Sequence, residues 1–259
     1  MDPLEAATIR LDHACAHLDS LKEEVRMYLD TQPYRVVAHD EPEEGRYVYR
    51  CEIGQPPTPR VGLLVGDVVH SIRAALDNLV WGFARLQHDP PKNPRLAFPI
   101  FKDFTGKRGW QATGQHAALR ASLPRVVADA VRDIQPWKVS KSDPTQDPLW
   151  VLDRLWNDDK HRSFVTTGSA GGMSEIFMRH VSAQGFNGPW IQYGAFESGE
   201  IVGGFGYTPN TKAEVDAEAK FAFDIALPKE GPTFGAPAVP LLVGLHDYVR
   251  NTVLPVFAT

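Results

Sequence analysis

One stretch of the sequence places several ionisable side chains along a single face of a predicted helix. Within residues 61–83, His70, Arg73 and Asp77 follow one another at spacings of three and four, which brings them together on one helical face. An arginine and an aspartate four residues apart can form an ion pair, and an imidazole beside them can titrate near neutral pH. These side chains work in a cleft, form a buried network between helices, or are simply exposed to solvent. The complete polar stripe is Asp67, His70, Arg73, Asp77 and Trp81.

A second polar face is predicted in the segment 149–162, LWVLDRLWNDDKHR. Arg154 and His161 are seven residues apart, or two helical turns, and therefore lie on the same side of a helix. A guanidinium that holds a phosphate and an imidazole that moves a proton can cleave RNA without a metal, by activating a 2′-hydroxyl against the neighbouring phosphate. The alternative is a short structural helix whose final cations, at 160–162, complement the helix dipole. The whole face is Trp150, Asp153, Arg154, Asn157 and His161.

Two functional hypotheses follow from these two faces. If the faces meet around a cleft, Arg154 and His161 form the catalytic pair of a metal-independent ribonuclease, and the other polar residues orient the pair and balance its charge. If instead the same side chains are enclosed and bonded to one another, the protein is a non-enzymatic interaction or structural protein. The sequence leaves both open. The binding residues expected under the first hypothesis are His70, Arg73, Asp77, Asp153 and Asn157.

Three segments carry a resemblance to known families. The segments GDVVHSIRAALDNLVW and LWVLDRLWNDDKHR, with FPIF between them, resemble an uncharacterised bacterial family with the pattern G-D-x-x-H-x-x-R-x-A-L-D and a later D-K-H-R. The spacing of Arg154 and His161 is also similar to that of HEPN helical domains, many of which are dimeric ribonucleases of toxin and phage-defence systems. This similarity implies that Arg154 contacts the scissile phosphate, that His161 acts as acid or base, and that a homodimer binds RNA. Leu155 departs from the polar residue that usually follows the arginine.

A metal site is a third possibility. His13 and His17 are four residues apart on the first predicted helix, so both imidazoles can reach one ion. A third ligand would come from His70 or Asp77, and the alternative is a pair of surface histidines. The proposed Arg/His pair itself requires neither a metal nor a cofactor.

No nucleotide-cofactor signature is present in the sequence. The glycine-rich segments GSAGG, at 168–172, and GGFG, at 203–206, do not join a strand to a helix start, as a phosphate-binding loop must. We interpret both as hairpin turns and expect no cofactor.

Composition and charge limit the class of protein further. The 259 residues include 27 basic and 32 acidic side chains, so the net charge of −5 gives no overall attraction for nucleic acid, and RNA would require a local patch. Cys15 and Cys51 are expected to be free thiols in a reducing compartment. The N-terminus lacks the features of a signal peptide and no apolar run approaches 18 residues, so we expect a cytoplasmic protein with no membrane partner.

The elements that must position these residues follow a segregated order of helices and strands. The pattern predicts one α+β domain over 1–259: a helical bundle around a long central helix (about 59–86), a mainly antiparallel sheet (34–53 and 164–227) and a C-terminal helix. The other helices are expected at 3–30, 115–134 and 149–162, and the C-terminal helix at about 240–256. Strands are expected at 34–38, 47–53, 175–181, 190–193, 200–207 and 220–227.

Overall fold

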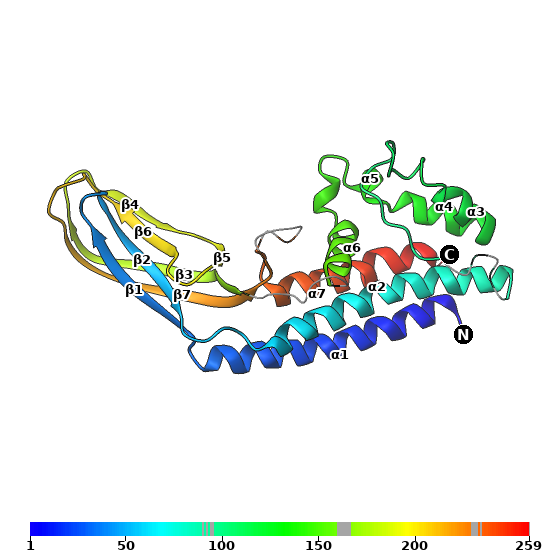
Figure 1. Ribbon diagram of the computed structural model, residues 1–259, viewed down its shortest axis with the longest axis horizontal. Helices are drawn as coiled ribbons and strands as arrows, with labels where there is room; N and C mark the ends of the chain where they lie inside the picture. Colours follow the sequence, from blue (N-terminus) through cyan, green and yellow to red (C-terminus); the bar gives the residue numbers. More distant parts are fainter. Residues whose placement is uncertain are drawn as a thin grey trace. The chain divides into compact units, whose positions relative to one another are not determined.

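The computed structural model describes residues 1–89, 91, 93, 96–159, 167–228, 233 and 235–258, and the side chains of these residues except 116 and 167–173. The fold is α+β with antiparallel strands and a C-terminal helix, as predicted (Figure 1). The chain groups into two compact units. We call residues 1–21, 63–164 and 239–259 the helical unit, and residues 22–62 and 165–238 the sheet unit. The two units are described separately, and the expectation of a single domain stays a prediction.

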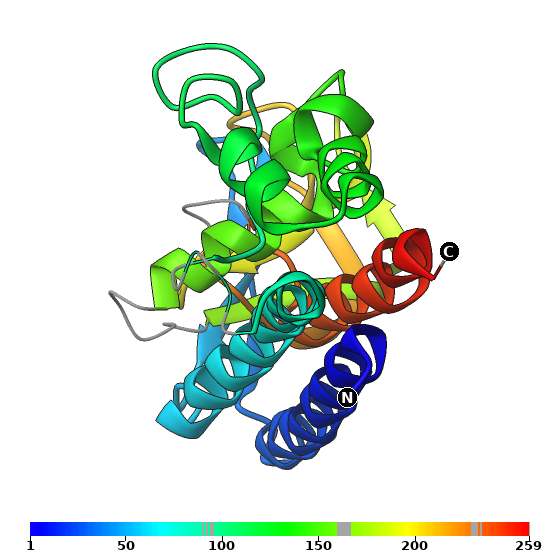
Figure 2. The ribbon, with the colours of Figure 1, turned by 90° about the vertical axis from the view of Figure 1, so that its right-hand side faces the viewer.

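The two long helices are confirmed with nearly the predicted bounds. Helix α1 spans Pro3–Asp30 and helix α2 spans Pro59–Gln87. In the helical unit they run side by side with the C-terminal helix α7, Ala238–Tyr248 (Figures 1 and 2). Their apolar stripes are buried because leucine, valine and alanine recur every three to four residues, which places them on one side of each helix. The fully buried residues include Ala7, Leu11, Leu21, Val65, Ile72, Leu76 and Leu79.

Shorter helices complete the helical unit. The predicted helix at 115–134 is divided into α3, Gln115–Ser122, and α4, Arg125–Asp133, because Pro124 takes an extended backbone conformation immediately before α4. After α5, Pro136–Val139, and the 3₁₀ turn η1, Pro144–Gln146, helix α6 spans Pro148–Asp159. The predicted end of that helix, 160–162, lies outside the described residues. Helix α7 continues as a π turn, η2, Val249–Val253, and a 3₁₀ turn, η3, Leu254–Phe257.

The strands of the sheet unit form two antiparallel sheets, whereas the sequence pattern predicted one. The sheets have the strand orders β1-β2-β6-β4 and β5-β3-β7. A buried cluster of Tyr49, Cys51, Phe196 and Val202, drawn from both sheets, forms the core between them. The strands are β1, Tyr34–Glu41; β2, Arg46–Ile53; β3, Thr167–Ser182; β4, Asn187–Ile191; β5, Gly194–Phe196; β6, Ile201–Gly206; and β7, Glu214–Ala226.

Both glycine-rich segments lie within strands, so the interpretation of them as hairpin turns is wrong. Gly168 pairs with Phe196 in β5, and Gly171 pairs with Ala222 in β7. In β6, a Cβ atom added at Gly204 would lie 2.5 Å from the carbonyl oxygen of Tyr47. Glycine is therefore required here because the backbone of a neighbouring strand lies too close for any side chain.

Candidate functional site

Arg73 is the centre of the polar cluster that the sequence placed on the central helix. Its Nη1 donates a hydrogen bond of 2.8 Å to Oδ1 of Asp77, one turn further along α2. Its Nη2 donates a hydrogen bond of 2.6 Å to the carbonyl oxygen of Phe98, 25 residues away in the sequence. Only 5% of the Arg73 side chain is exposed. The predicted Arg73–Asp77 ion pair is therefore present. Its guanidinium is buried against another segment of the chain, whereas the Asp77 side chain is 28% exposed.

That segment, residues 96–101, crosses α2 without helix or strand structure, and we call it the strap. The carboxylate of Asp77 accepts a hydrogen bond of 2.8 Å from the main-chain N–H of Phe98. Gln135, which is fully buried, donates to the carbonyl oxygen of Pro99 at 2.8 Å and accepts from the N–H of Phe101 at 2.9 Å. The strap is thus held at three backbone positions, 98, 99 and 101, by side chains from two other segments, which satisfies main-chain groups that a sheet or helix would otherwise pair.

Helix α6 contributes a second carboxylate to the cluster. Oδ1 of Asp153 lies 4.0 Å from Nε of Arg73, and the Trp156 ring centroid lies 5.0 Å from the Arg73 guanidinium carbon. Asn157 donates to Oδ2 of Asp153 at 3.0 Å. The structure therefore links four of the five predicted binding residues, from two helices far apart in the sequence, through a single chain of contacts.

His70, the fifth predicted binding residue, is exposed one turn before Arg73 on α2. The nearby Asp159 lies at the end of α6, where Gly66 of α2 leaves room for it: a Cβ atom at Gly66 would lie 2.6 Å from Oδ1 of Asp159. Burial and the charge of Asp67 raise the pKa of Asp159, while His70 opposes them. His70 therefore belongs to the surface around the end of α6 rather than to the Arg73 network.

Arg154 points to a different surface from its neighbour Asp153. Its side chain is 44% exposed, it lies 3.7 Å from Asp158 on the same helix, and its guanidinium lies 6.0 Å from the centre of the Trp150 ring. The ammonium of Lys102 lies 5.6 Å from the centre of the same ring. The predicted partner of Arg154, His161, lies outside the described residues, so the geometry of the Arg/His pair stays a prediction.

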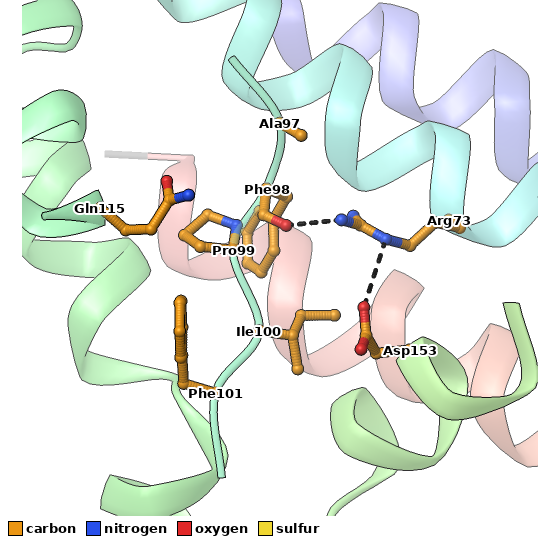
Figure 3. A pocket seen from close by; sticks show the side chains of 8 residues that line it. All are labelled: Arg73, Ala97, Phe98, Pro99, Ile100, Phe101, Gln115 and Asp153. Atoms are coloured by element: carbon orange, nitrogen blue, oxygen red, sulfur yellow. Dashed lines mark hydrogen bonds and ion pairs between the residues drawn. The ribbon is translucent and has the colours of Figure 1, made fainter. Parts of the chain in front are cut away.

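A cavity of about 220 Å³ lies beside the Arg73 network, as Figure 3 shows. Its wall is formed by Arg73 and Asp153 together with residues of the strap, and this lining is mainly polar. Nε of Arg73 is buried and has no hydrogen-bond partner among the described residues. The sequence predicts that this proline-rich segment is irregular and that its aromatic residues pack against the protein, as the buried Phe98 does. It did not indicate the bonds from the strap to α2 or the part of Gln135. The lining residues are Arg73, Ala97, Phe98, Pro99, Ile100, Phe101, Gln115 and Asp153.

The histidines of the first helix lie close together on α1. The ring centroids of His13 and His17 are 4.5 Å apart, and Nδ1 of His17 lies 3.9 Å from Oδ2 of Asp67. Within the part of the chain that the structure describes, no group of three or more His, Cys, Asp or Glu residues is arranged to hold a metal ion. No helix among the same residues is long and apolar enough to cross a membrane.

Comparison with known proteins adds no assignment to this geometry. No protein-family model, no curated protein and no solved structure matches the chain. Two resemblances therefore remain predictions. One is that of α2, the strap and α6 to a bacterial family, and the other is that of Arg154 and His161 to HEPN domains.

Proposed function

We propose that this protein is a non-enzymatic interaction or structural protein, and that the cluster of Arg73, Asp77 and Asp153 is a structural network. The observation that supports the proposal most directly is the burial of Arg73. Both terminal nitrogens of its guanidinium donate hydrogen bonds within the helical unit, one to Asp77 and one to the strap. A group with 5% of its side chain exposed and both ends bonded is placed to hold segments together rather than to receive a substrate phosphate.

The energetics of the network are consistent with this role. Removing the guanidinium would leave the buried carbonyl of Phe98 without its donor, and the carboxylate of Asp77 without its cation. The Asp77 side chain is 28% exposed, so water can solvate part of its charge once the guanidinium is gone. Loss of a hydrogen bond to a charged group then typically costs about 1.5–3 kcal/mol. The strap would then lose its attachment to α2.

A matched pair of substitutions tests the proposal. Arg73→Ala should lower the free energy of unfolding by about 1.5–3 kcal/mol, whereas Arg154→Ala, the same chemical change at an exposed position, should change it by less than about 1 kcal/mol. Urea denaturation followed by circular dichroism gives both values. In the same preparations, the unsubstituted protein should leave labelled single-stranded RNA intact. Cleavage of that RNA, lost on Arg154→Ala substitution, would contradict the proposal.

The second candidate function is metal-independent cleavage of RNA by Arg154 and His161. The exposure of Arg154 favours it, because this guanidinium and the ammonium of Lys102 both lie near Trp150, where a phosphate could reach two cations and a base could reach an aromatic ring. In this mechanism Arg154 neutralises charge on the phosphate and His161 transfers the proton.

This second candidate has its own test. Arg154→Ala and His161→Ala should each abolish cleavage of a labelled RNA in the presence of EDTA, with the melting temperature nearly unchanged. Arg10→Ala is a control, because Arg10 also stands seven residues before a histidine, His17. Cleavage that survives both substitutions, or that Arg10→Ala abolishes equally, would exclude the assigned pair.

A further inference from the structure

The surface of α4 carries a second apolar stripe beside the one that packs into the helical unit. The packed side is formed by Val127, Ala128 and Val131, which are buried. Val126, which is 65% exposed, and the partly exposed Ala130 lie one turn apart on another side of the helix. The packing of α4 in the helical unit does not account for this second stripe, which is open to contact with another molecule.

The second stripe lines a groove beside the C-terminal turn η3. The groove has a volume of about 590 Å³ and a mainly apolar lining, to which η3 contributes Val256, a residue that is 38% exposed. On α4 the lining runs from residue 125 to residue 133, or about 12 Å of helix. A groove that follows a helix for this distance fits a partner helix laid along it. The lining residues are Arg125, Val126, Asp129, Ala130, Asp133 and Val256.

Guanidiniums outnumber the carboxylate at one end of this groove, although the chain as a whole has a net charge of −5. Asp129 lies 2.9 Å from Nη1 of Arg120 and 3.3 Å from Nη1 of Arg132. Arg125 adds a third guanidinium, with its Nε 3.7 Å from the same carboxylate and its side chain 82% exposed. One carboxylate can neutralise only one of these charges, so positive charge remains, and Arg125 is the most exposed of the three.

The other carboxylate of the groove is also paired with cations. Asp133 lies 2.8 Å from Nη2 of Arg132 and forms an ion pair with Lys138. Around the groove, four cations therefore share two carboxylates. This excess of positive charge favours a partner that brings carboxylates of its own.

We propose that the groove binds an acidic amphipathic helix of another protein, with its apolar side chains against Val126 and Val256 and its carboxylates beside Arg125. A second copy of this chain is a poor occupant, because two α4 helices face to face would bring their excess cations together. A basic helix is disfavoured for the same reason. The inference names the kind of partner for the interaction role proposed above and rests on that role.

Three peptides of one design test the inference by fluorescence anisotropy. Each is a fluorescein-labelled helix of about four turns, crosslinked on its outer face because short helices are marginal in water. The first has leucines at every third and fourth position, flanked by glutamates. The second has lysines in place of the glutamates, and the third has serines in place of the leucines. The first should bind saturably and at least about ten-fold more tightly than the others. Equal binding of the lysine peptide overturns the proposal.

Matched substitutions place the binding in the groove. Arg125→Glu and Val126→Ser should each weaken binding of the acidic peptide about ten-fold. Arg10→Glu and Ile9→Ser, at exposed positions on α1, should leave it unchanged. All four side chains are exposed, so the melting temperatures should stay nearly constant, which separates a lost contact from misfolding. Equal binding by the Arg125→Glu and Arg10→Glu variants overturns the proposal.

Two further measurements test the other occupants. Sedimentation of the protein alone should show no dimer that Val126→Ser removes, and vesicles of phosphatidylglycerol should not displace the peptide. A dimer lost on that substitution, or displacement by the vesicles, overturns the assignment. The RNA-cleavage test of the proposed function depends on Arg154 of α6, whereas peptide binding depends on α4, so the failure of one is distinguishable from the failure of the other.

Discussion

At the scale of single residues, burial decides which of two chemically identical groups can react. Cys51 lies fully buried between the two sheets, and burial raises the pKa of its thiol to about 12. Cys15 is exposed on α1. Since the thiolate is the reactive form, the two cysteines should behave very differently, although both are free thiols as the sequence predicted.

A thiol titration measures this difference. Ellman's reagent should react rapidly with one thiol per native molecule at pH 8 and with two after denaturation in guanidinium chloride. Cys15→Ser should leave the native protein with no rapidly reacting thiol. Two fast-reacting thiols in the native protein would show that the core around Cys51 is open to solvent.

Asp224 gives a residue-scale prediction for pH dependence. Burial raises the pKa of this half-buried carboxyl on β7, against a hydrogen bond from the N–H of Ile225. A raised pKa means that the folded state favours the protonated form. Protonated Asp224 therefore contributes its full stabilisation of the folded state below the unfolded-state pKa of about 3.9. This contribution is lost as the pH rises through the folded-state pKa of Asp224.

Asp224→Asn should remove this loss of stability at higher pH, because the amide carries no charge at any pH. Its oxygen can still accept the hydrogen bond from the N–H of Ile225. Relative to the unsubstituted protein, the variant should become progressively more stable between about pH 4 and pH 7. Thermal unfolding at a series of pH values measures the effect. Asp216→Asn, exposed on the same strand, is the control and should show no such gain. A gain for Asp224→Asn that is largest at pH 4 would contradict the assigned cause.

At the scale of elements, the strap shows how an irregular segment becomes a fixed part of the helical unit. Its main chain forms neither a helix nor a strand, and Pro99 has no N–H to donate, so side chains from other segments act as the hydrogen-bond partners. Gln135 serves two of its residues, Pro99 and Phe101, and also donates to the carbonyl oxygen of Val131. One buried amide thus ties α4 to the strap.

Gln135→Ala should therefore lower the free energy of unfolding by about 1–3 kcal/mol, because it leaves the buried carbonyl of Pro99 and the part-buried N–H of Phe101 without partners. Gln111→Ala, at an exposed position, should have an effect within about 0.5 kcal/mol. Denaturant unfolding compares them, and amide exchange at Phe101 should accelerate in the first variant only. Similar stabilities of the two variants would show that the strap does not depend on Gln135.

At the scale of the whole molecule, two compact units share one chain that passes between them several times. Each has its own core: the apolar faces of the long helices in one, and the contact between two sheets in the other. A substitution that disturbs one unit tests whether the two units unfold together, because local unfolding can be followed separately in each.

Gly204→Ala provides this disturbance, because the added Cβ would lie 2.5 Å from the backbone of β2. Gly188→Ala on β4 is the matched control, since nothing lies within 4 Å of its added Cβ. Hydrogen exchange should accelerate in β2 and β6 of the first variant, while residues 63–87 of α2 keep their protection. Equal acceleration in both units would support the single domain that the sequence pattern predicted.

The long helices and most of the strands could be predicted from the sequence alone, whereas the short elements α5 and β5 could not. Leucine and valine at helical spacing predicted α1 and α2, and the alternation of Phe221, Phe223 and Ile225 predicted the C-terminal half of β7. The Arg73–Asp77 pair could also be predicted, because residues four apart on a helix meet whatever the surrounding fold. These features depend on local periodicity, which the sequence displays directly.

Which segments these side chains contact depends on the tertiary structure. Asp153 and Arg154 are neighbours on one predicted polar face, but packing turns Asp153 toward Arg73 and leaves Arg154 on the surface, because about 100° of helix separates adjacent residues. The bond from Arg73 to Phe98 spans 25 residues, and nothing in local spacing encodes it. The glycines of β6 were likewise interpreted as a turn, because the backbone that excludes a side chain there belongs to a distant strand.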